Sequence, residues 1–146
     1  MAQYFCPACF AQVGSAVRNC PDCGVDADQW RAERTFTQRL VHALGHSLPS
    51  ARMMSIIALG GRADPETAAA LASCAHAHPT DVVQGMEVVR AIAAMPPAAA
   101  QRQAALRSLA GHHSRMVAEE ARRILAADGQ LPAPDSGAPR ALGGKA

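Results

Sequence analysis

Four cysteines in two close pairs are the residues of this chain best suited to chemistry. The pairs are Cys6–Cys9 and Cys20–Cys23, and ten residues separate them. The two thiolates of such a pair can reach one ion from the same side, and two pairs complete a tetrahedral shell of four sulfurs, which suits zinc. The spacing therefore predicts a structural site in which these four cysteines bind one Zn²⁺ ion.

The residues around the cysteines favour tight metal-binding turns. Pro7 and Pro21 follow the first cysteine of each pair and preset the turn. Gly24 follows the second pair, where a positive φ is useful. Between the pairs we expect one short hairpin, with its turn at Gly14–Ser15. An iron site of the rubredoxin kind and a redox dithiol are the competing chemistries, although a redox motif would need one pair in a βαβ context.

The segment CPACFAQVGSAVRNCPDCG resembles the short bacterial zinc-ribbon module that often begins a longer protein. The resemblance covers about residues 4–25, and the four metal ligands of that module match the four cysteines one for one. Phe10 is a departure, because the module usually has glycine after the first pair. The resemblance implies a small structural zinc ribbon, which we place at residues 1–26.

The rest of the chain has the composition of packed helices. Apolar residues make up 49% of the chain and aromatic residues only 3%, so alanine and aliphatic side chains must form the core. Apolar residues recur at helical spacing in six segments, and capping residues such as Asp64-Pro65-Glu66 separate them. Gly60–Gly61 is expected to end the second helix. The six helices group into three pairs near residues 28–59, 65–93 and 97–127.

A repeat of 33 residues runs through this region. Leu59, Ile92 and Leu125 are 33 residues apart, each near the end of a helix. The stretch LGGRADPETAAAL is similar to the turn between HEAT repeats of the short bacterial kind, and the resemblance covers about residues 34–127. It implies a mostly α fold, a short right-handed α-solenoid of three HEAT-like helix pairs over residues 28–128, in which stacked pairs bury a continuous core. A compact helical bundle is the alternative.

Two residues test the regularity of this repeat. The second helix of a HEAT pair often carries an early arginine, a place that Arg52 fits and that residues 82–85 leave without one. Gly85 within the second pair costs about 1 kcal/mol relative to alanine in a helix.

Residues 129–146 are rich in glycine, proline and alanine, and we expect a disordered tail there.

Other residues with potential chemistry are interpreted as structural. His42 and His46 can share a helical face, but no third ligand is indicated, so we expect exposed or turn-capping histidines. Cys74 is expected to be a small buried residue. The sequence has no nucleophile–base constellation and no phosphate-binding loop, so we predict that the protein is not an enzyme. Five methionines are expected to fill the core or contact turns: Met53, Met54, Met86, Met95 and Met116.

The distribution of charge bears on the choice of partner. Residues 1–30 contain one base and three acids, and four thiolates around Zn²⁺ add two negative charges, so the ribbon is a poor phosphate binder. We therefore predict a non-catalytic adaptor or scaffold that binds another protein. The alternative is nucleic-acid binding through the basic last helix pair, whose arginines are Arg102, Arg107, Arg115, Arg122 and Arg123. Further surface candidates are Glu33, Arg34, Arg39, Arg52 and Arg62.

The sequence also predicts a compartment. It has no run of 18 uncharged apolar residues that would span a membrane, and its N-terminus lacks the pattern of a secretory signal. We expect a cytoplasmic protein without a membrane partner, in a reducing compartment where paired cysteines bind metal more often than they form disulfides.

Overall fold

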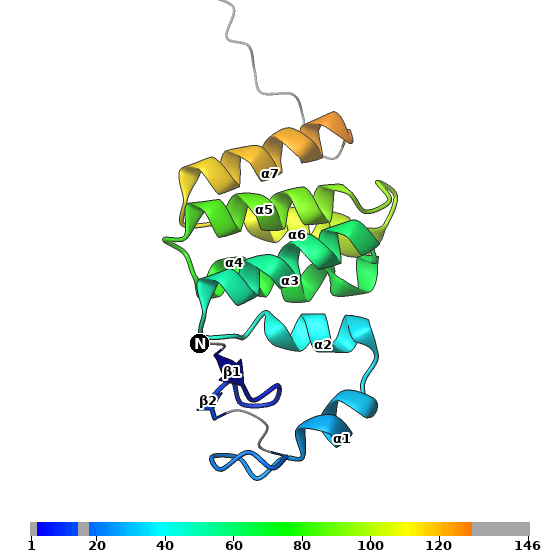
Figure 1. The fold of residues 1–146 in the computed structure, drawn as a ribbon. Coiled ribbons are helices and arrows are strands. Elements are labelled where there is room, and N and C mark those ends of the chain that lie inside the picture. Colours follow the sequence, from blue (N-terminus) through cyan, green and yellow to red (C-terminus); the bar gives the residue numbers. More distant parts are fainter. Residues whose placement is uncertain (1–2, 15–17, 130–146) are drawn as a thin grey trace, which may run out of the picture.

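The computed structural model describes residues 3–14 and 18–129, and within these ranges the chain is mostly helical with a small cysteine-bearing region at its N-terminus (Figure 1). The predicted disordered tail, apart from Gly129, lies outside the described residues. Across the described ranges, every helix is too short or too polar to cross a lipid bilayer.

The N-terminal region contains two short strands and one short helix. Strand β1 (Tyr4–Phe5) pairs in antiparallel fashion with β2 (Gln12–Val13), so the first cysteine pair lies in the turn that joins them. Helix α1 (Ala27–Ala32) follows the second cysteine pair. The hairpin predicted between the cysteine pairs would join β2 to residues that lie partly outside the described ranges, whereas the described partner of β2 is β1. The predicted turn includes Ser15, which lies outside the described residues.

All six predicted helical segments are present. Thr35 begins the first of them with a capping box, in which its hydroxyl accepts from the Gln38 amide and the Gln38 side chain accepts from the Thr35 amide. Asp64 and Asp81 cap later elements through their carboxylates. The elements are α2 (Phe36–Ala43), α3 (Pro49–Arg62), the 3₁₀ helix η1 (Pro65–Thr67), α4 (Ala68–Ala77), α5 (Val82–Ala93), α6 (Ala100–Leu109) and α7 (Arg115–Ala127).

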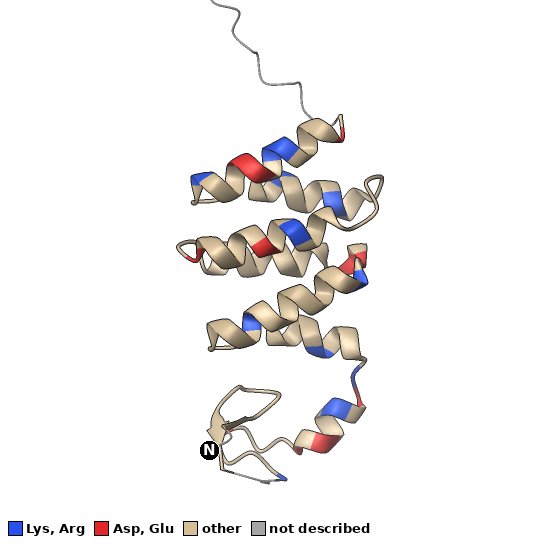
Figure 2. Cartoon of the chain, turned by 45° about the horizontal axis from the view of Figure 1, so that its top comes forward, with Lys and Arg blue, Asp and Glu red and all other residues tan. Residues whose placement is uncertain are grey.

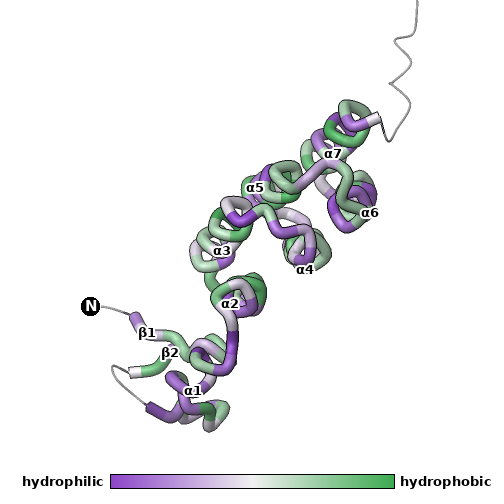
Figure 3. Tube along the Cα trace, turned by 90° about the vertical axis from the view of Figure 1, so that its right-hand side faces the viewer, coloured by the Kyte–Doolittle hydropathy of each residue, from purple (hydrophilic) through white to green (hydrophobic). Residues whose placement is uncertain are grey.

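These helices lie in two rows with the apolar core between them. Helix α5 packs against both α3 and α7 in one row, and α4 packs against α6 in the other. Figure 3 looks nearly along the helices and shows α2 at the start of the second row. The three residues of the 33-residue repeat, Leu59, Ile92 and Leu125, are all fully buried. The three positions of the 33-residue spacing therefore lie in the core, one each on α3, α5 and α7.

Glycines in the first row serve close packing. Helix α3 continues through Gly60–Gly61 and ends at Arg62, so the predicted helix end at this glycine pair is wrong. A Cβ atom on Gly60 would lie 3.1 Å from that of Ala91 on α5. A Cβ atom on Gly85 would lie only 2.7 Å from Cγ2 of Val117 on α7. The absence of a side chain at Gly85, a poor residue for an isolated helix, lets α5 and α7 approach each other.

Arg52 is part of the interior. Its side chain is 5% exposed, so the expectation that it is a surface contact is wrong. Its Nε donates to Oε1 of Gln84 at 2.8 Å, and Nη1 donates to the carbonyl of His46 at 2.8 Å. Gln84 lies within the stretch of α5 that lacks an arginine, and its amide accepts the bond from α3 instead. This buried polar contact joins the first and second helix pairs, and each group has a partner.

Candidate metal centre

The structure brings the four cysteine sulfurs together. All four lie within 4.8 Å of one another, and none of these cysteines is in a disulfide. The Sγ atoms of Cys6 and Cys23 are 3.7 Å apart, as are those of Cys9 and Cys20. A tetrahedral ion with metal–sulfur bonds of about 2.3 Å separates its sulfurs by about 3.8 Å. The cluster therefore has the size and the donor set for one such ion.

The two cysteine pairs are built by the same backbone turn. In the first, the amide of Cys6 donates to the carbonyl of Ala11 at 2.9 Å, and the amide of Phe10 donates to the carbonyl of Cys6 at 3.0 Å. In the second, the corresponding two bonds measure 2.9 and 2.8 Å. The two cysteine turns therefore share the same backbone hydrogen bonds as well as the same cysteine spacing.

The residue after each pair has a left-handed backbone. Gly24 has a φ of +75°, as its position after the second pair predicts. Phe10 occupies the corresponding place in the first turn with a φ of +62°. This conformation costs a residue with a side chain about 1–2 kcal/mol. The Phe10 ring contacts His42 and His46 at centroid distances of 4.9 and 4.6 Å, and these contacts offset the strain.

His42 and His46 join the metal-binding region to the helices. Nε2 of His42 donates to the carbonyl of Ala8, inside the first cysteine turn, at 2.8 Å. His46 is buried, its ring lies edge-on to Phe5 at 5.1 Å, and its Nδ1 accepts from the amide of Leu48 at 3.0 Å. The turn-capping role is confirmed for His46. Within the part of the chain that the structure describes, only the four cysteines form a metal-binding cluster.

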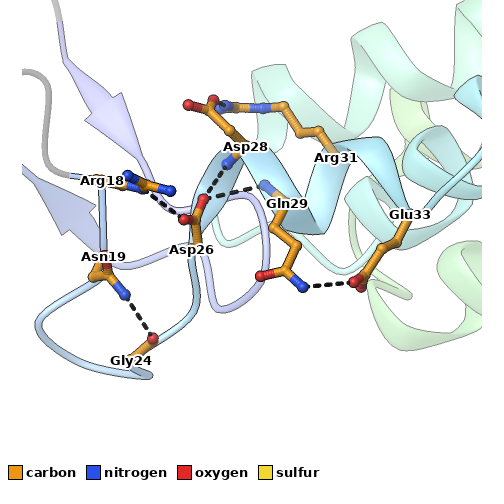
Figure 4. Close-up of polar contacts among 8 residues, drawn as sticks. All are labelled: Arg18, Asn19, Gly24, Asp26, Asp28, Gln29, Arg31 and Glu33. Carbon is orange, nitrogen blue, oxygen red and sulfur yellow. Dashed lines mark hydrogen bonds and ion pairs between the residues drawn. The ribbon is translucent and has the colours of Figure 1, made fainter.

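The second cysteine turn is fixed to α1 by a carboxylate, as Figure 4 shows. Asp26 accepts from the amides of Asp28 and Gln29 at 3.0 and 3.1 Å and caps α1. Nε of Arg18 pairs with the same carboxylate at 2.8 Å, and this hydrogen bond is the main cause that lowers the pKa of Asp26. Trp30 of α1 is buried, and its ring lies 4.9 Å from that of His42.

The thiols of the cluster differ in acidity. The backbone amide of Cys23, with that of Asp22 and the thiols of Cys6 and Cys9, lowers the pKa of Cys20 to about 7. The amide of Ala11 lowers the pKa of Cys9, but burial and the neighbouring thiols outweigh it and raise that pKa to about 12. The hydrogen bonds among the thiols therefore favour the anionic form of Cys20 and disfavour that of Cys9. A divalent cation held by Cys6, Cys9, Cys20 and Cys23 would favour the thiolate form of all four.

The cluster of four sulfurs is buried on one side and exposed on the other. Cys6 and Cys20, the first cysteine of each pair, are buried, whereas Cys9 and Cys23 are exposed. Four sulfur ligands complete a tetrahedron and leave no coordination position for a substrate. The arrangement therefore suits a metal that holds structure together.

Three of the five arginines of the last helix pair form ion pairs with acidic residues. Arg102 is buried and forms an ion pair with Asp128. Arg115 pairs with Glu119 at 2.6 Å. Arg123 pairs with Glu120, also at 2.6 Å. Arg122 donates to the carbonyl of Ala110 at 2.7 Å. These bonds reduce the cationic surface that the sequence suggested for nucleic-acid contact.

Cys74 is the fifth cysteine, and it lies apart from the cluster. It is buried in α4, as expected, and its thiol donates to the carbonyl of Leu44 at 3.5 Å. Burial raises its pKa, which makes the thiolate scarce and the residue unreactive.

Sequence reasoning missed the contact between the cysteine turns and α2. The signal was present in the aromatic Phe10 where glycine is usual, and in two histidines one helical turn apart. Comparisons with protein-family profiles, curated proteins and solved structures gave no match. The zinc-ribbon and HEAT relationships are therefore resemblances of motif and pattern.

Proposed function

We propose that the protein is a non-catalytic protein-binding adaptor, in which a zinc ribbon covers one end of a short right-handed α-solenoid of three HEAT-like helix pairs. Support for the solenoid comes from the 33-residue repeat, whose members occupy equivalent buried positions. Further support comes from the row in which α3, α5 and α7 pack in succession. The division into a ribbon at residues 1–26 and a helical part at residues 28–128 belongs to the same proposal.

Exposed apolar side chains on α3 carry the proposal of protein binding. Met54 is 70% exposed and Ile57 is 52% exposed, and their spacing of three places them on one face of the helix. Met116 on α7 and Val83 on α5 are also exposed. Met54 and Met116 therefore do not fill the core, which is one of the two roles expected of the methionines. Apolar side chains that gather on one row of helices favour contact with another protein.

Zinc is the ion that we propose for the four cysteines. When bound, it supplies a fixed tetrahedral link between the two cysteine turns. Cys6 and Cys20 would hold it from the buried side, and Cys9 and Cys23 from the exposed side. A region this small has too little apolar core to fold alone, so the metal provides the missing free energy. Free thiols also fit the reducing cytoplasm that we propose as its compartment.

Cross-linking from α3 tests the proposed function. We would place a photo-reactive residue at position 57 of the intact protein, irradiate its native cells and identify the attached proteins by mass spectrometry. We expect a defined partner whose capture is lost in Met54→Glu and kept in Ala69→Glu, a matched change at an exposed site on α4. Absence of any partner would contradict the proposal. So would salt-sensitive retention of nucleic acid in place of protein.

A further inference from the structure

The first helix pair carries arginines without acidic partners. Residues 36–62 contain no aspartate or glutamate. The guanidinium carbons of Arg39 and Arg62 lie 5.5 and 5.4 Å from the centroid of the same ring, that of Phe36, which is 51% exposed. Among the described residues, neither arginine forms an ion pair. Figure 2 shows basic positions on α2 and α3 without acidic ones on these helices.

Arg39 has an unused hydrogen-bond donor. Its Nε atom is buried and has no partner within the part of the chain that the structure describes. Burial of a donor without an acceptor is unfavourable and uncommon, so the absence of a partner requires an explanation. Arg39 also lines a cavity of about 240 Å³ between the cysteine turns and α2, together with Phe5, Phe10 and Trp30. The cavity is accordingly a mostly apolar space with two arginines, Arg31 and Arg39, at its wall.

We propose that this surface, made of Phe36, Arg39, Arg62 and the cavity beside Arg39, binds an acidic segment of a partner protein. A carboxylate of that segment pairs with the Arg39 guanidinium. An apolar side chain of the segment packs on the exposed Phe36 ring, and a second carboxylate faces Arg62. The proposal rests on the proposed function, since it names the chemistry of the partner that an adaptor of this kind would bind.

Charge complementarity favours a short acidic peptide over a nucleic acid. A planar guanidinium pairs side by side with a carboxylate, and an aromatic ring between two cations suits a peptide that alternates acidic and apolar residues. A nucleic acid needs a longer cationic track to bind tightly.

An NMR titration tests the proposal on the full-length, zinc-loaded protein. The probe is the synthetic peptide Ac-Glu-Glu-Leu-Phe-Glu-Asp-NH₂. Its control is the same peptide with Gln and Asn in place of the acids, and a thymidine oligonucleotide forms a third arm. We expect the acidic peptide alone to shift the Nε–Hε signal of Arg39 and the amides near Phe36 and Arg62. Equal shifts with the neutral peptide, or shifts with the oligonucleotide and none with the acidic peptide, would overturn the proposal.

Substitutions of Arg39 test whether the peptide binds at this surface. Arg39→Gln should weaken peptide binding about tenfold or more, because it removes a charge-assisted bond. Arg39→Lys keeps the charge and should also weaken binding, since lysine lacks the side-by-side geometry; it is the variant to use if Arg39→Gln perturbs the fold. Arg115→Gln changes an exposed arginine of the last pair and should leave binding unchanged. Unaltered affinity in both Arg39 variants would refute the site.

The cross-linking experiment separates this proposal from the proposed function. A partner captured through α3 that binds the Arg39→Gln/Arg62→Gln double variant with unchanged affinity would overturn this site and leave protein binding intact. A weaker complex with that double variant supports both. Failure to capture any partner overturns the adaptor function.

Discussion

Phe10 combines two effects that act in opposite directions. Its backbone has the left-handed conformation that glycine adopts at the matching position, Gly24, and this conformation is costly for phenylalanine. Its ring lies against His42 and His46 and holds the first cysteine turn on α2. A residue that is unfavourable for the turn alone is therefore favourable for the contact between the cysteine turns and the helices.

Ala63 has the same left-handed backbone, and only its small methyl group packs against the core. It follows α3 with a φ of +50°. Ala63→Gly should therefore raise the free energy of unfolding by about 0.5–1 kcal/mol, after the greater chain entropy of glycine is included. Urea unfolding measures this change. Ala69→Gly, at an exposed position within α4, should lower stability by about 1 kcal/mol. A lower free energy of unfolding in Ala63→Gly would show that the backbone at Ala63 is not strained.

His46 should make stability depend on pH. Burial, with the charge of Arg52, lowers its pKa in the folded protein. The unfolded chain therefore binds the proton first, so stability is complete above about pH 6.5, the ordinary pKa of histidine, and falls as the pH decreases below it. Melting temperatures between about pH 5.5 and 7.5 should show this slope. The slope should be smaller in His46→Asn and unchanged in His113→Asn, which alters an exposed histidine. Equal slopes in both variants would contradict this assignment.

Gly85 shows how helix packing overrides helix propensity. Alanine would favour the isolated helix by about 1 kcal/mol. Its Cβ would nevertheless lie 2.7 Å from the stiff, buried side chain of Val117, and overpacking costs about 1–3 kcal/mol. Gly85→Ala should therefore destabilise the protein by about 1 kcal/mol in urea unfolding. Gly61→Ala, where nothing lies within 4 Å of the added Cβ, should stabilise it.

A second substitution, at Val117, tests whether the clash with Val117 causes the loss of stability in Gly85→Ala. If the clash with Val117 is responsible, Val117→Ala should cost less in the Gly85→Ala protein than in the parent protein. Additive effects of the two substitutions would show that the close contact between α5 and α7 does not limit this position.

The helices were predictable because their signals are local. Apolar spacing and caps such as Asp64 act within one helix, so all six segments follow from the sequence. The need for glycine at positions 60 and 85 could not be predicted from local signals, because each glycine faces a residue of another helix. The burial of Arg52 has the same origin, since its partner Gln84 is 32 residues away. The pairing of β1 with β2 was not predicted, because the first cysteine turn is itself the connection between the two strands.

For the molecule as a whole, the contact through Phe10 should couple metal binding to helix stability. Removal of the metal by a chelator should increase hydrogen exchange in α2 more than in α7, which is remote from the cysteines (Figure 1). In Phe10→Ala the metal should still bind, but its removal should affect α2 less than in the parent protein. Hydrogen exchange with mass spectrometry measures both. Equal exchange in α2 with and without metal would contradict the coupling.

The arrangement of the whole molecule was only partly predictable. Cysteine spacing indicated the four-sulfur cluster, because ligand spacing in a short turn fixes ligand position. The i,i+4 spacing indicated the ion pair of Arg115 with Glu119, but nothing local indicated that Arg102 would be paired. Arg102 and Asp128 meet across 26 residues, whereas Arg39 and Arg62 meet at the Phe36 ring and lack acids. Because the prediction rested mainly on the number of arginines, it assigned the cationic surface to the last helix pair.

The metal content of the purified protein, measured by elemental mass spectrometry under reducing conditions, tests the central claim most directly. We predict one zinc ion per chain, and almost none in Cys20→Ser, which removes a buried ligand. Iron in place of zinc would contradict the ion that we propose. Freshly reduced protein with no bound metal would contradict the site itself.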